Sequence, residues 1–94
     1  MFNVIKTEYT ETAGGRMSLI SETEYKNIDI DYALELIEDL GHTIVNSFTD
    51  SSEYTQEDGE LDYETGHTTR SMVSVEGPGV RLGELRMMTR WVTG

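Results

Sequence analysis

The stretch IDYALELIEDL, residues 30–40, decides the fold. Its apolar residues recur three and four positions apart, a spacing that places them on one face of an amphipathic helix. These residues are Ile30, Ala33, Leu34, Ile37 and Leu40. Asp29 can cap the first turn and Gly41 can follow the last, so the sequence predicts a helix here that packs its apolar face against another element.

The segments before this helix have the composition of a β-hairpin. Residues 2–9 are rich in β-branched and aromatic types, and a glycine turn separates them from residues 16–25, where the side chains alternate in polarity. This alternation predicts a half-buried second strand. Its inner face would carry Met17, Leu19, Thr23 and Tyr25, and its outer face Arg16, Ser18, Glu22 and Glu24.

Two more strands are predicted after the helix, over residues 42–49 and 67–76, and Gly77-Pro78-Gly79 is a strong turn signal. Between those strands, residues 50–66 form a polar, acidic stretch to which no strand is assigned.

The last segment, residues 80–92, fits two structures. As a helix it aligns Leu82, Leu85, Met88 and Val92; as a strand it turns Leu85, Met87, Thr89 and Trp91 inward. Gly83 and the Thr-Arg-Trp-Val ending favour the strand, and Met88 and Val92 at a sheet edge would offer a homodimer contact. The prediction is a single α+β domain over residues 1–94, with one amphipathic helix on a mainly antiparallel sheet in the order β-β-α-β-β-β.

The composition restricts the function. The chain has 94 residues, 18 acidic and 7 basic side chains, a net charge of −11 and no cysteine. Disulfides and thiol catalysis are therefore excluded, and direct binding to nucleic acid or anionic lipid is disfavoured by charge. There is no apolar run of about 18 residues and no charged-then-apolar leader, so we expect neither a membrane span nor a signal peptide. The expected location is therefore the cytoplasm.

The charge is unevenly distributed. Residues 1–69 hold 16 acidic and 3 basic side chains, whereas residues 70–94 hold 2 acidic and 4 basic ones. Arg86 and Arg90 are expected to form ion pairs with the acidic body; the alternative is a small basic edge that associates with the acidic face of another copy. This distribution predicts that the acidic side chains lie on one side of the molecule and are not spread evenly over its surface.

Three groups of carboxylates make up this acidity. The first is the helix stripe Asp31, Glu35, Glu38 and Asp39. Like charges four residues apart repel, and acids in a last turn oppose the helix dipole, so the stripe is locally unfavourable. The second group, in residues 50–64, has no base: Asp50, Glu53, Glu57, Asp58, Glu60, Asp62 and Glu64. The third is Glu22 and Glu24 on the outer face of the second strand.

The spacing of these acids suggests a function. If residues 60–64 are extended, Glu60, Asp62 and Glu64 point one way at intervals of about 6.6 Å. Rows of negative charge about 6 Å apart imitate the phosphates of a nucleic-acid strand and would attract a basic groove. An ordinary solvated surface and an adaptation to high salt are the alternatives.

Motifs for chemistry are incomplete. A calcium loop starting at Asp58 lacks the glycine and the final glutamate that such loops use. The Glu-x-Lys tripeptide ending at Lys26 is short, and neither His42 nor His67 has a ligand partner at metal-site spacing. We expect no enzyme, no catalytic residue, no cofactor and no metal.

In size, charge, absence of cysteine and its acidic rows at 31–39 and 53–64, the chain resembles small acidic inhibitors encoded by bacteriophages, the DNA-mimic anti-restriction proteins and some anti-CRISPR proteins. The resemblance implies a non-catalytic viral protein, often dimeric, that occupies the nucleic-acid site of a basic binding protein or nuclease in the host cytoplasm. The predicted partner-binding residues are Glu22, Glu24, Asp31, Glu35, Glu38, Asp39, Glu53, Glu57, Asp58, Glu60, Asp62 and Glu64. The alternative is a small interaction module that uses a hydrophobic edge near Met87 to Val92, its acids serving solubility alone.

Overall fold

The structure, a computed structural model, describes the backbone of residues 1–93 and the side chains of residues 1–89. Its elements are β1 (Phe2–Glu11), β2 (Met17–Ile28), α1 (Ile30–Glu38), β3 (His42–Ser47), β4 (Ser51–Gln56), β5 (Glu60–Leu61), β6 (Thr68–Glu76) and α2 (Gly79–Thr93). The strands form one antiparallel sheet in the order β2-β1-β6-β4-β3, with the short β5 paired to β6. The predicted α+β class with a mainly antiparallel sheet is confirmed.

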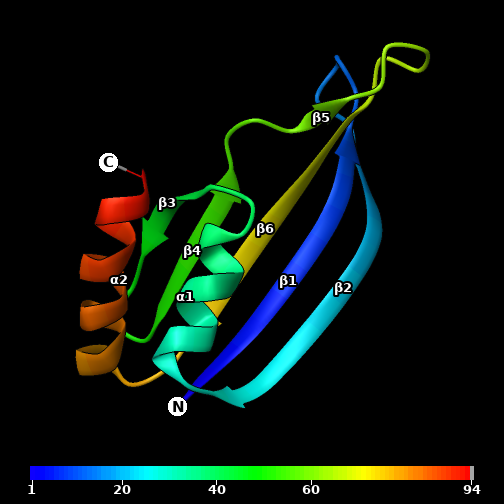
Figure 1. Cartoon of the computed structure of the whole chain (residues 1–94). Helices are drawn as coiled ribbons and strands as arrows, with labels where there is room; N and C mark the ends of the chain where they lie inside the picture. The colour runs from blue at the N-terminus through cyan, green and yellow to red at the C-terminus, as the bar shows by residue number, and fades with distance from the viewer. Residues whose placement is uncertain (94) are drawn as a thin grey trace.

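Both helices lie on the same face of the sheet, as Figure 1 shows. We call it the helix face and the other the open face. Side chains of paired residues lie on the same face, so the register assigns each position. Val4 pairs with Val75 and Tyr54 with Val73, and all four are buried on the helix face. The alternate positions, such as Ile5 and Ser74, therefore lie on the open face.

One hydrophobic core joins the helices to the sheet. It consists of Phe2, Val4, Ala33, Ile37, Tyr54, Val73, Val75, Leu82 and Leu85. Beyond it, β1, β2, β5 and β6 continue as an arm that the helices do not cover (Figure 1). The arm comprises residues 9–21 and 59–70, and it gives the molecule its elongated shape of 44 × 26 × 20 Å.

The predicted helix is α1, and its boundaries follow the predicted signals. The Asp29 carboxylate accepts a hydrogen bond of 2.9 Å from the Tyr32 amide, which satisfies one free N–H of the first turn. Gly41 follows the helix with a φ of 62°, a left-handed conformation that suits glycine. Ala33 and Ile37 are fully buried, whereas Leu40, beyond the helix end, is 38% exposed.

The strand expected over residues 80–92 is wrong, because this segment belongs to α2. Leu82, Leu85 and Thr89, three and four residues apart, are buried, and the helix contacts α1, β3 and β4. Met87, expected inside, is 66% exposed. The side chain of Trp91 lies outside the described residues. Helical spacing brings two leucines to the core here, where a strand would have turned only Leu85 inward.

The predicted order also lacks two strands that lie within the stretch left unassigned, the two-residue β5 and the longer β4. Ser52 and Tyr54 are fully buried on its helix face. A serine at a core position concealed the alternation, and the neighbouring acids gave the segment the composition of a loop. The observed order is β-β-α-β-β-β-β-α.

Arg86 explains how Ser52 is tolerated in the core. Its guanidinium donates hydrogen bonds to the Ser52 hydroxyl at 2.7 Å, to the Ser51 carbonyl at 2.9 Å and to the Phe48 carbonyl. The predicted ion pair of Arg86 is therefore wrong, since this side chain ties α2 to the β3–β4 turn. Arg90 lies outside the described side chains.

The half-buried second strand is also a wrong prediction. In β2, which is at the edge of the sheet, Met17 is 56% and Leu19 64% exposed. A bulge at Ile20 shifts the register, because Glu8 pairs with Ser21 but Tyr9 with Leu19. Met17 and Leu19 consequently share the open face with Glu22 and Glu24, and not with Thr23 and Tyr25.

Candidate acidic interface

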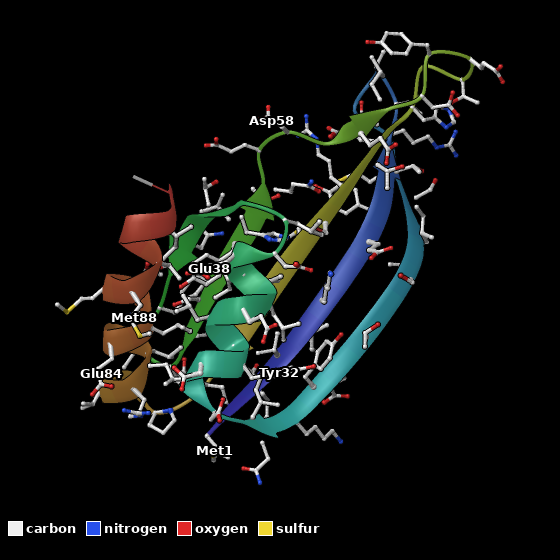
Figure 2. The ribbon with its side chains drawn as sticks, in the orientation of Figure 1. Met1, Tyr32, Glu38, Asp58, Glu84 and Met88 are labelled. Atoms are coloured by element: carbon white, nitrogen blue, oxygen red, sulfur yellow. The ribbon has the colours of Figure 1, made fainter. Side chains whose placement is uncertain are left out.

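The acidic stripe of α1 lies on the surface that points away from the sheet. Asp31, Glu35, Glu38 and Asp39 are all exposed, and none is in an ion pair with a described side chain. The last turn of α1 has no basic residue. No described cation therefore lies within ion-pair distance of the stripe. In Figure 2, Glu38 lies on this outward surface.

The row expected over residues 60–64 is broken. Only Glu60 and Leu61 form a strand, and Asp62 begins a turn in which its carboxylate accepts a hydrogen bond from the Glu64 amide at 2.9 Å. The Asp62 carbonyl accepts another from Gly66, whose φ of 73° closes the turn. The acids of this segment are nevertheless all exposed and outside ion pairs: Glu57, Asp58, Glu60, Asp62 and Glu64.

A hollow of about 210 Å³ connects the helix stripe to this second group. It is lined by Glu8, Leu40, Gln56, Glu60, Thr69 and Ser71. Leu40 follows directly after the α1 stripe, and Glu60 begins β5, so acidic side chains continue from α1 across the hollow to the arm. We call the set Glu8, Asp31, Glu35, Glu38, Asp39, Asp58 and Glu60 the acidic band. Glu8, which the sequence analysis did not select, is found only through the tertiary structure.

The other predicted binding residues lie elsewhere. Glu22 and Glu24 pair with Thr7 and Ile5, and Glu53 with Ser74, which places all three on the open face. Glu53 also accepts a hydrogen bond of 2.7 Å from Asn46. The twelve predicted residues therefore do not form one surface. The four acids of α1, together with Asp58 and Glu60, belong to the band, and three residues are on the open face. The remaining three are on or beside the arm.

Few acids are neutralised. The ion pairs among the described side chains are Lys26–Glu24 at 3.8 Å, Arg70–Glu11 at 3.5 Å and Arg81–Glu84 at 2.5 Å. None of them involves a residue of the acidic band. The carboxylates of the band therefore present their charges to the solvent and to a partner.

A buried histidine lies beneath the band. His42 forms hydrogen bonds of 2.9 Å with the Ile37 carbonyl and 2.7 Å with the Ser71 hydroxyl, joining the end of α1 to β6. Burial lowers the pKa of His42 below its usual 6.5, an effect that the Ile37 carbonyl opposes. The neutral ring then donates to Ile37 and accepts from Ser71.

A serine paired with a neutral histidine resembles a nucleophile with its base. Here, however, Ser71 is only 2% exposed, and Glu8 and Glu60 line the hollow beside it. An oxyanion formed in that hollow would be repelled by both carboxylates. The sequence did not indicate this contact, because the two residues are 29 positions apart.

Among the side chains of residues 1–89, no three His, Asp or Glu are arranged to hold a metal ion. Neither described helix is long and apolar enough to cross a membrane. No family model matches the chain, and no match was found among curated proteins or solved structures.

Proposed function

We propose that this chain is a non-catalytic binding protein that blocks a basic, nucleic-acid-handling protein in the cytoplasm by presenting its acidic band in place of nucleic-acid phosphates. The observation that carries the proposal is that the band follows α1 and crosses to the arm without an ion pair to any described cation. A partner whose groove evolved for a polyanion offers complementary charge at many points along such a surface.

The hollow within the band would strengthen such a contact. Two carboxylates, Glu8 and Glu60, face it together with the amide of Gln56 and the hydroxyls of Thr69 and Ser71. Ammonium and guanidinium groups pair well with carboxylate and amide oxygens, so a lysine or arginine of the partner fits here. Long-range attraction by the net charge of −11 would also speed association at low salt.

The test compares two variants with the same change in net charge. The first reverses Glu38, Asp58 and Glu60 to lysine, and the second reverses Asp50, Glu76 and Glu84, which are exposed but outside the band. Figure 2 shows Glu84 and Asp58 far apart in the molecule. Asp62 is spared because its carboxylate holds a turn.

Each protein is immobilised, incubated with bacterial lysate and eluted with duplex DNA. We expect the unchanged chain and the second variant to retain nucleic-acid-binding proteins that DNA elutes, and the first variant to retain about tenfold less. A first variant that stays folded by circular dichroism and retains as much as the unchanged chain would contradict the proposal.

A second candidate is an interaction module that uses an apolar contact. The edge strand β3 and the turn after it expose Ile44, Val45 and Phe48 by 38%, 49% and 50%, and no acid lies among residues 42–49. Association through this edge would be insensitive to salt, whereas binding through the acidic band weakens as salt rises.

A further inference from the structure

The outer edge of β2 is the longest unpaired strand edge of the described sheet. β2 has 12 residues and pairs only with β1. Its backbone groups on the other side have no strand partner, and such an edge is a template for another extended chain. Proteins usually protect an edge with lysine, proline or a bulge. Here one bulge is at Ile20 and a second shift in register follows Tyr25, where the single lysine Lys26 also lies, so residues 21–25 between the two shifts are regular and unprotected.

The charges on these five residues determine which chain can pair with them. Glu22 and Glu24 are on the open face, two residues and thus about 6.6 Å apart. A second copy of β2 is disfavoured in the antiparallel registers that match the two faces and are centred on residues 22–24. When the pairing is centred on Thr23, Glu22 of one copy lies opposite Glu24 of the other. When it is centred on a glutamate, that glutamate lies opposite the same residue of the other copy. Like charges directly opposite destabilise a sheet, whereas opposite charges stabilise it.

We propose that the edge of β2 accepts an extended, basic segment of the partner protein as an added strand, with lysine or arginine at alternate positions beside Glu22 and Glu24. Because of the bulge, Leu19 and Met17 lie on this same face and are more than half exposed. They would contact apolar side chains at one end of the added segment. Backbone hydrogen bonds supply affinity in this mode, and the alternate side chains supply selectivity.

This inference extends the proposed function by naming a second contact with the same class of partner, on the face opposite the acidic band. The probe is a synthetic peptide of about ten residues in which lysine and threonine alternate, with valine in place of the last two lysines. Its binding to the full chain is followed by ¹H–¹⁵N NMR and by titration of a fluorescent label. We expect the amide resonances of residues 19–25 to shift.

Two controls separate strand addition from general attraction between opposite charges. The peptide with alternate backbone amides N-methylated keeps its charge but cannot form the ladder, and we expect it not to bind β2. Replacing Glu22 and Glu24 by glutamine should weaken binding about fivefold. The matched variant Glu76→Gln, Glu84→Gln, exposed but outside both β2 and the acidic band, should change it by less than about twofold, because salt screens distant charges.

Equal binding of the methylated peptide, or shifts confined to α1, would overturn the inference. The peptide experiment contains neither DNA nor a nucleic-acid-binding protein, so its failure leaves the acidic band untouched. Conversely, if the lysate experiment fails while the peptide still adds to β2, the proposed function is wrong and the edge site stands.

Discussion

The half of the molecule that the helices cover differs sharply from the arm. All nine residues of the core cluster are in the covered half. The arm buries a single large hydrophobic residue, Tyr9, and exposes Met17, Leu19, Ile20, Leu61 and Tyr63. Apolar burial is the main source of folding free energy, so the covered half holds the fold together while the arm contributes little stability. The arm is instead where surface is available to a partner.

The largest expected difference between the two regions comes from the same substitution in each. Leu85 is fully buried between α2 and the sheet, and Leu19 is 64% exposed on the arm. Leu85→Ala should lower the free energy of unfolding by about 3 kcal/mol, because it removes buried methyl groups and leaves a cavity. Leu19→Ala should lower it by less than about 0.5 kcal/mol. Urea unfolding followed by circular dichroism measures both, and equal losses would show that the arm is part of the core.

Gly77 in the covered half and Gly59 at the arm allow a second comparison of the two regions, because each glycine is packed so closely that an added Cβ would collide with a neighbouring residue. A Cβ at Gly77 would lie 2.5 Å from the ring of the buried Phe2, whereas a Cβ at Gly59 would lie 2.6 Å from the Thr69 carbonyl on the arm. Gly77→Ala should cost about 1–3 kcal/mol in the same unfolding experiment, since the core must shift. Gly59→Ala should instead separate β5 from β6 and leave the unfolding midpoint nearly unchanged.

Hydrogen exchange measured by NMR tests whether Gly59→Ala separates β5 from β6. In Gly59→Ala the Asp62 amide, which donates to the His67 carbonyl, should exchange faster while core amides keep their protection. A large fall in the midpoint of Gly59→Ala would mean that the arm and the covered half unfold together.

The smallest effect is the pH dependence that His42 confers. Its pKa is lowered in the folded state, so below about pH 6.5 the unfolded chain takes up a proton that the folded chain resists. The contribution of His42 to the free energy of unfolding is therefore complete above its ordinary pKa and decreases as the pH drops below that value. In urea titrations from pH 7.5 to 5.5, His42→Gln should show a smaller fall in the free energy of unfolding than the unchanged chain. Identical slopes for His42→Gln and the unchanged chain would contradict this role.

Local patterns predicted much of the covered half. The spacing of Ala33 and Ile37, the cap at Asp29 and the glycine at 41 are signals within one helix, and α1 follows them. The remainder depends on contacts distant in sequence. Ser52 is buried because Arg86, 34 residues later, donates to it, and no local pattern marks such a pair. Leu85 fits a helix and a strand equally well, and only packing against α1, β3 and β4 decides between them.

The candidate site was predictable in composition more than in placement. The α1 stripe follows from helical geometry alone, and its acids are exposed as expected. The row at residues 60–64 is broken by side-chain and backbone hydrogen bonds of Asp62, which alternation of residue types cannot reveal. The bulge at Ile20 moved Met17 and Leu19 to the face of Glu22 and Glu24, and Glu8 joins the band only because β1 passes the end of α1.

The central claim is that the acidic band and nucleic acid compete for one site on the partner. A labelled DNA duplex bound to a protein captured from the lysate is titrated with the chain, and its displacement is followed by fluorescence anisotropy at two salt concentrations. We predict complete displacement by the unchanged chain, weaker at the higher salt, and about tenfold weaker displacement by the variant with Glu38, Asp58 and Glu60 reversed. A ternary complex in which the DNA stays bound would contradict the claim.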